Sequence, residues 1–147
     1  MRSWRRSLTS LLKMLLQVDS MFEVTQNPII AEHIVNRVER RDTNGALVTF
    51  IGSLRGYSPG GKRVLFAECE GDKEMAEQQL RGVSEEINTR WQLEDVSICH
   101  RFGRIGVGET ILVVAIAAPH RQEAFDACQY AVDRIKQGIQ LNEVLES

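Results

Sequence analysis

The stretch AIAAPHRQEAFDACQYAVDRIK, residues 115–136, changes from a strand pattern to a helix pattern at Pro119. The residues before this proline end an apolar run that is typical of a buried strand. After it, apolar residues recur at the spacing of one helix face, namely Ala124, Ala127, Cys128, Ala131, Val132 and Ile135. A buried strand that leads into a helix with one apolar stripe predicts helices packed on a β-sheet.

His120 and Arg121 stand at the point where this strand gives way to the helix. The first backbone N–H groups of a helix have no partner within it, and the helix dipole places partial positive charge at the same end. This position therefore favours an anion. The stretch does not by itself identify which anion.

The rest of the chain alternates between strand and helix patterns. Five strands are expected, at residues 21–24, 46–55, 62–70, 95–103 and 109–118. Asn27 followed by Pro28 is typical of a helix start and predicts a helix that ends near Arg41.

A second helix is expected to begin after Asp72, whose carboxylate suits an N-cap, and to end near Trp91. Its expected apolar stripe consists of Met75, Leu80, Val83 and Ile87. We also expect Trp91, Phe102 and Phe125 in the core. The strands are joined by short turns without a regular βαβ rhythm, so the chain is predicted to be α+β, with a mainly antiparallel sheet packed by helices.

Length and composition are those of one soluble domain: 147 residues, 43% hydrophobic and 26% charged. The formal net charge of -2 argues against a general nucleic-acid-binding protein, which needs a basic face. Cys69, Cys99 and Cys128 are widely spaced and form no CxxC pair. We therefore expect free thiols and a cytoplasmic protein.

Residues 1–20 differ from the rest in charge, because they contain four basic residues and a single acidic one, Asp19. In a helix, Trp4 and several leucines of this segment would share one face. The apolar run is too short and too charged for a membrane span. Two interpretations remain: a helix that binds a membrane surface or directs the chain to an organelle, or an upstream extension without function. We favour the second, with a domain formed by residues 21–147.

The sequence contains no GxSxG, P-loop, HExxH or GxGxxG motif. Serine-nucleophile, zinc and dinucleotide chemistry are therefore poorly supported. What remains is a set of cationic or titratable side chains near the expected ends of elements: Arg55, His100, Arg101, His120, Arg121 and Lys136. Taken singly, such residues are usually solvated surface groups, and a lysine in the last helical turn suits the helix dipole.

Four motifs occur in one order: GALVTFIGSLRG at 45–56, MAEQQL at 75–80, HRFGRIGVGE at 100–109 and APHRQEAFDACQYAVDRIK at 118–136. Together they resemble the catalytic large subunit of molybdopterin synthase. This resemblance implies an α/β-hammerhead-like domain that inserts two sulfurs into cyclic pyranopterin monophosphate, forming the molybdopterin dithiolene. It implies as partners a second copy of the chain and, at each end of that homodimer, a ubiquitin-like small subunit with a thiocarboxylate on its C-terminal glycine.

The resemblance also implies site residues. Phe50 and Arg55 line the pocket, His120 and Arg121 hold the anionic substrate, and Lys136 is the catalytic lysine, with Arg55 beside it in the chemistry. No cofactor or metal is implied, because fixed cations suit both the phosphate and the thiocarboxylate. The Lys136 amine can stabilise the anion, move protons or be acylated. His100, within an apolar strand, we interpret as structural.

The C-terminal tail departs from the family. There the chain normally runs through a proline and an aromatic residue to a second functional lysine, whereas here it reads QGIQLNEVLES and has Glu143 in that place. A carboxylate opposes the binding of anions, so the alternative is a non-catalytic homologue that keeps the dimer and small-subunit binding. The tail is expected to be mobile, and Arg101 or Arg104 is a candidate to replace the missing lysine.

Overall fold

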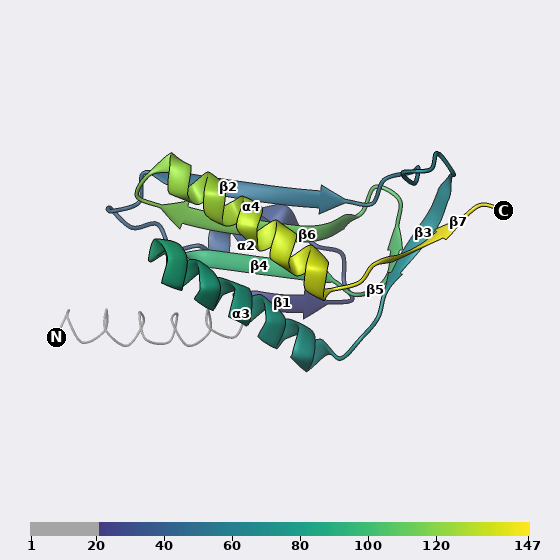
Figure 1. The fold of residues 1–147 in the computed structure, drawn as a ribbon, viewed down its shortest axis with the longest axis horizontal. Helices are drawn as coiled ribbons and strands as arrows, with labels where there is room; N and C mark the ends of the chain where they lie inside the picture. Colours follow the sequence, from purple (N-terminus) through teal and green to yellow (C-terminus); the bar gives the residue numbers. More distant parts are fainter. Residues whose placement is uncertain (1–20) are drawn as a thin grey trace.

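The computed structural model describes residues 21–147, which form two β-sheets and three helices (Figure 1). The interpretation of residues 1–20 lies outside the described residues. In chain order the elements are β1 (Phe22–Thr25), α2 (Ala31–Arg37), β2 (Ala46–Ser53), β3 (Val64–Cys69), α3 (Lys73–Trp91), β4 (Val96–Arg101), β5 (Gly103–Gly106), β6 (Thr110–Ala118), α4 (Arg121–Gly138) and β7 (Asn142–Leu145). Within this part of the chain, no helix is long and apolar enough to cross a membrane.

The larger sheet has four strands in the order β1-β4-β6-β2. The central strands β4 and β6 are antiparallel, β2 is antiparallel to β6, and β1 runs parallel to β4. Helices α3 and α4 lie side by side over one face, and α2 covers the other (Figure 1). Because both faces of β4 are covered, all six of its residues are buried.

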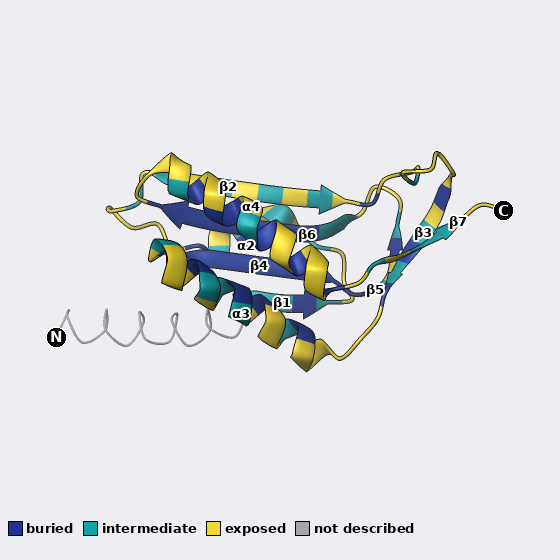
Figure 2. Ribbon diagram, in the orientation of Figure 1, coloured by how far each residue is buried: buried dark blue, intermediate teal, exposed yellow. Residues whose placement is uncertain are grey.

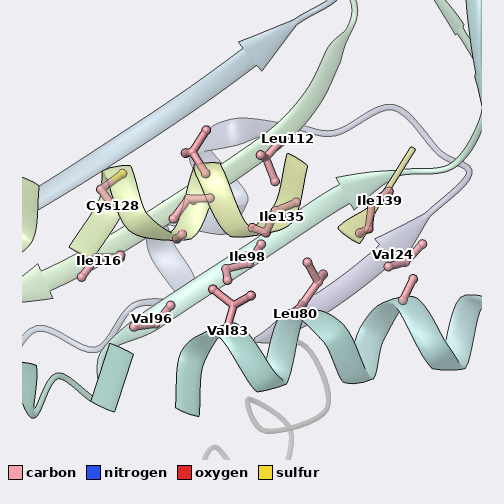
Figure 3. Packing of buried hydrophobic residues seen from close by; sticks show 14 of the residues in the cluster. Val24, Leu80, Val83, Val96, Ile98, Leu112, Ile116, Cys128, Ile135 and Ile139 are labelled. Carbon is pink, nitrogen blue, oxygen red and sulfur yellow. The ribbon is translucent and has the colours of Figure 1, made fainter. Parts of the chain in front are cut away.

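The main core lies between this sheet and the helices α3 and α4 (Figure 3). All six apolar residues expected on the inner face of α4 are buried there, which confirms the stripe predicted from the spacing. The opposite face of the sheet is closed by α2, where Ile34 packs on Cys99 and Val113. Figure 2 shows the result, with buried residues along the inner sides of the helices and along β4 and β6.

A smaller sheet, in the order β5-β3-β7, lies beyond one end of the larger one (Figure 1). The chain passes between the two sheets at Gly103, whose φ of 84° lies in the left-handed region that favours glycine. Just before this turn, the Phe102 N–H donates a 2.7 Å hydrogen bond to the carbonyl of Thr25. The smaller sheet is thereby tied to the end of β1.

The predicted α+β architecture is confirmed, and so are the five expected strands. Asp72 caps α3 as expected, because its Oδ1 accepts a 3.0 Å hydrogen bond from the Met75 N–H, and α3 ends at Trp91. The three cysteines are free, as the spacing predicted, and the structure shows that all three are buried. Burial raises the pKa of the Cys69 thiol to about 11.

The first helix is shorter than expected, because α2 begins after Ile30 and ends at Arg37. Val38 takes an extended conformation and packs against Ala115 and Ala117 of β6. The chain beyond it is held to Asp95, whose carboxylate accepts hydrogen bonds from Arg41 and Asn44. These tertiary contacts end the helix before Arg41.

Two residues predicted to be buried are exposed. Met75 is 62% exposed, because the buried stripe of α3 runs through Ala76, Leu80, Val83 and Ile87, and five helical positions turn Met75 away from Leu80. Phe125 is 58% exposed, since it follows the buried Ala124 by a rotation of about 100°. Phe102 is buried, as predicted, and Trp91 is partly buried against the core.

Strands β5 and β7 were not predicted. β5 begins at the last residue of the strand expected at 95–103 and continues beyond it, and β7 occupies the tail that was expected to be mobile. Both are four residues long and pair antiparallel with β3 on either side. The tail is therefore anchored by backbone hydrogen bonds in place of the missing proline and aromatic residue.

Leu80→Ala is expected to lower the free energy of unfolding by about 2–5 kcal/mol, because the side chain is fully buried between α3 and the sheet and its loss leaves a cavity. Met75→Ala in the same helix is the matched control and is expected to change it by less than about 0.5 kcal/mol. Urea denaturation followed by circular dichroism measures both. Equal losses would show that Met75 contributes to the core.

Candidate active site

A cavity of about 370 Å³ opens where β2 and α4 end and the tail begins. Its lining residues come from β2, the loop after it, β4, β6, α4 and the tail: Phe50, Gly52, Ser53, Leu54, Arg55, His100, Ile111, Leu112, Ile135, Lys136, Ile139, Gln140, Leu141 and Glu143. This volume falls within the range of about 300–1,000 Å³ that is typical of small-molecule sites. Within residues 21–147, no group of three or more His, Cys, Asp or Glu side chains is placed to hold a metal ion.

Phe50 and Gly52 form one wall of this cavity. Side chains alternate between the faces of a strand, so these two positions of β2 face the same side, toward α4. A Cβ at Gly52 would lie 2.9 Å from Cε1 of Phe50, closer than carbon atoms pack. Glycine at this position therefore leaves room for the Phe50 ring.

Arg55 stands just after β2, and its backbone is held by its neighbour. The ladder between β2 and β6 shifts register between Gly52 and Ser53, and the next side chain, Leu54, is buried. The Leu54 N–H donates to the Glu109 carbonyl at 3.0 Å, and the Gly108 N–H donates to the Leu54 carbonyl at 2.9 Å. Leu54 thus fixes the base of Arg55, whose side chain is exposed.

Lys136 lies in the last turn of α4 and reaches the same cavity. Its Nζ is 5.9 Å from the centre of the Phe50 ring, which is within reach of a cation–π contact. The preceding residue, Ile135, is buried in the core and fixes the rotation of the helix at this point. Neither Lys136 nor Arg55 forms a hydrogen bond or ion pair with another described residue, so both cations are available to a ligand.

His120 and Arg121 do not line this cavity. His120 is the N-cap of α4 and Arg121 its first residue, whereas Lys136 lies near the other end of the same helix. Fifteen residues of uninterrupted helix at about 1.5 Å each separate the backbones of Arg121 and Lys136 by about 22 Å. The structure therefore brings together Phe50, Arg55 and Lys136, and it leaves His120 and Arg121 apart from them within one chain.

The model of one family, described as MoaE protein, matches residues 24–138. This chain belongs to the MoaE family. The molybdopterin synthase catalytic subunit of Bacillus subtilis is 41% identical over 116 residues, which cover 79% of this chain and 73% of that protein. The catalytic subunit of the same name from Thermoplasma volcanium is 36% identical over 132 residues, covering 88% of this chain and 95% of that protein.

The structural comparison agrees. The crystal structure of molybdopterin synthase from Staphylococcus aureus has a TM-score of 0.78 and 31% sequence identity to this chain, and the match covers 86% of this chain and 93% of that one. This MoaE domain therefore shares the architecture of a known molybdopterin synthase through most of its length, which confirms the resemblance drawn from the four motifs.

Two arginines proposed to replace the missing lysine of the tail serve other contacts in this MoaE domain. The Arg101 side chain is 8% exposed, pairs with Glu109 and donates to the backbone carbonyls of Gln26 and Arg104. The Arg104 guanidinium lies 3.9 Å from the centre of the Phe66 ring and bonds Glu68. Neither of these two candidates lines the cavity.

The tail contributes Glu143 to the cavity instead. Glu143 lies opposite Ala67 in the β3–β7 ladder, which holds its backbone in place. The charged lining groups are thus two cations, Arg55 and Lys136, and one carboxylate. The sequence showed the substitution but not the strand that fixes its position.

His100 is the lining residue that sequence reasoning missed. Its place in an apolar strand suggested a structural role, and the residue is indeed buried. Burial lowers the pKa of the His100 imidazole, against a smaller opposing effect of its hydrogen bond to the Arg101 carbonyl. The imidazole is therefore neutral at pH 7.

Removing the negative charge of Glu143 is expected to improve anion binding in this cavity. Glu143→Gln and then Glu143→Lys should each raise the affinity for inorganic phosphate about five-fold, because a like charge near a surface opposes binding by ~1 kcal/mol. Titration at low ionic strength, followed by NMR, measures the effect.

Glu146→Gln and Glu146→Lys are the matched controls, since Glu146 is exposed near the end of the tail and does not line the cavity. They should leave phosphate affinity within about two-fold, because salt screens distant surface charges. Equal gains at both positions would mean that net charge alone controls binding, which would contradict a local role for Glu143.

Proposed function

We propose that this chain is the catalytic subunit of a molybdopterin synthase. It transfers sulfur from the C-terminal thiocarboxylate of a ubiquitin-like small subunit to cyclic pyranopterin monophosphate, forming the molybdopterin dithiolene. One observation carries the proposal: two exposed cations, Arg55 and Lys136, without ion-pair partners among the described residues, converge with Phe50 on one cavity. The names of the relatives supply the reaction class.

The chemistry of the two substrates suits this cavity. Both the cyclic phosphate and the thiocarboxylate are anions, and fixed cations stabilise them without rearranging during the reaction. The Phe50 ring and the aliphatic side chains of Ile111 and Leu112 offer an apolar wall to a flat heterocycle. Lys136 stabilises the thiocarboxylate, moves a proton during thiol addition or is acylated, and the variants below separate the first of these roles from the other two.

His120 and Arg121 belong to this site only through a second copy of the chain. β2 is an edge strand, and exposed apolar side chains border it, namely Leu47, Ile51 and Phe125. Such an edge suits antiparallel pairing with the same strand of a second copy. We therefore include a homodimer in the proposal.

The direction of α4 supports this arrangement. β2 is antiparallel to β6, and α4 turns back after β6, so β2 and α4 run the same way (Figure 1). Two-fold pairing of β2 with its copy would set the two α4 helices in opposite directions. The start of one α4, with His120 and Arg121, would then lie toward the end of the other, with Lys136.

A second candidate function is a non-catalytic homologue that keeps the dimer and the small-subunit binding. One observation favours it: the carboxylate of Glu143 lines the cavity that is proposed to bind anions. Purified precursor, the thiocarboxylated small subunit and this chain separate the two candidates. Formation of the dithiolene product supports the enzyme, and small-subunit binding without product supports the homologue.

Lys136→Ala is expected to lower sulfur transfer at least about 100-fold, because the site loses a charged group that acts on the reacting atoms. Its melting temperature should stay near that of the unaltered protein, since the side chain is exposed. Lys136→Arg keeps the charge without the amine. Partial activity would indicate electrostatic stabilisation, and complete loss would indicate proton transfer or acylation.

Lys73→Ala is the control for this experiment, because Lys73 is an exposed lysine of α3 that does not line the cavity. It should convert precursor at the unaltered rate, measured by mass spectrometry of the product. Normal turnover in Lys136→Ala would remove Lys136 from the mechanism.

Mixing Arg121→Ala protein with Lys136→Ala protein is expected to restore activity that each lacks alone. If each site takes Arg121 from one protomer and Lys136 from the other, a hybrid dimer has one intact site, and random exchange yields about a quarter of full activity. Subunit exchange is verified by native mass spectrometry. Exchange without recovered turnover would refute the shared site.

A further inference from the structure

We propose that His100 is a substrate-binding residue of this site, whose neutral Nε2 accepts a hydrogen bond from an N–H group of the pterin ring. This inference rests on the proposed function. His100 is a buried residue of the central sheet, and its position in an apolar strand gives no sign of a role in binding.

The hydrogen bond at Nδ1 determines which ring nitrogen carries the proton. Nδ1 of His100 lies 2.8 Å from the backbone carbonyl oxygen of Arg101. A carbonyl oxygen only accepts hydrogen bonds, so Nδ1 must donate. In the neutral imidazole the other nitrogen, Nε2, then carries a lone pair and acts as an acceptor.

Nε2 is not sealed inside the core. Within the described part of the chain, no buried side-chain nitrogen or oxygen lacks a hydrogen-bond partner. Nε2 of His100 has no such partner, so this atom must reach the protein surface although the residue as a whole is only 4% exposed. The ring lines the cavity, which provides that surface.

The ring is also held in one orientation. Phe102 contacts it edge to face, with ring centres 6.1 Å apart. On the adjacent strand β6, the residue opposite His100 in the ladder is Leu112, which also lines the cavity. A fixed acceptor between an aromatic and an aliphatic neighbour suits the recognition of a flat ring with N–H donors.

The polar groups of the cavity are arranged by depth. Its charged lining groups, Arg55, Lys136 and Glu143, are exposed or half-buried, whereas His100 is the buried polar residue of the lining. A ligand with an anionic end and a heterocyclic end therefore meets cations near the opening and a neutral acceptor at the base. Cyclic pyranopterin monophosphate has both ends.

Two substitutions separate this role from a structural one. His100→Asn places an amide N–H near the position of Nδ1, so it keeps the bond to the Arg101 carbonyl and loses the acceptor at Nε2. His100→Gln reaches the position of Nε2 with an amide oxygen and loses the inner bond. A role in binding therefore predicts that His100→Asn loses more affinity for the pterin than His100→Gln does. A purely structural role predicts the opposite order.

The measurement is calorimetric titration of each full-length variant with cyclic pyranopterin monophosphate, without the sulfur donor. His100→Asn should weaken binding about ten-fold or more, because it leaves a substrate N–H without a partner, while melting near the unaltered temperature. His100→Gln should bind within about three-fold of the unaltered chain although it melts lower. Affinity for the small subunit should not change in either variant.

Unaltered binding by folded His100→Asn overturns the role of His100, and so does a loss confined to small-subunit affinity. If His100→Asn does not fold, His100→Gln decides: retained binding supports the acceptor at Nε2, and lost binding in a folded protein overturns it. An unaltered chain that binds no pterin refutes the proposed function, and the role of His100 with it.

Discussion

The burial of β4 and β6 on both faces is the constraint on which the other features of this domain depend. With α3 and α4 on one side and α2 on the other, these strands exclude water, so each polar side chain within them needs a partner or an opening. Ser97 donates to the Met21 carbonyl, and Arg101 is held by Glu109 and two carbonyls. His100 satisfies one nitrogen within the protein and presents the other to the cavity.

The cavity lies where this layered packing stops, and buried neighbours position its exposed cations. Leu54 and Ile135 are both buried, and each directly precedes one of the two cations, Arg55 and Lys136. An anchored backbone with a long exposed side chain lets a cation reach a ligand while its aliphatic stem covers apolar surface. Rigidity at the base and freedom at the tip suit the anion-binding role proposed for both cations.

The tail changes the electrostatics of this site without changing its architecture. Pairing of β7 with β3 holds Glu143 beside the cations, so the carboxylate is part of the cavity wall. Arg101, at the end of β4, pairs with Glu109, and Arg104, in β5, contacts Glu68 and the Phe66 ring. The balance of charge at the cavity is therefore set by Arg55, Lys136 and Glu143.

The sequence by itself determined the α+β class through local periodicity, and it indicated the family through four motifs within short segments. The resemblance to that family implied a shared pocket for Phe50, Arg55 and Lys136, and only the tertiary structure brings them together, from β2, the loop after it and α4. Only the tertiary structure decided the shorter α2, the exposure of Met75 and Phe125, and the strands β5 and β7. These depend on contacts between distant segments, such as Val38 on β6 and β7 on β3. The same holds for His100, since a strand buried at every residue has no alternation to reveal which side chain faces a cavity.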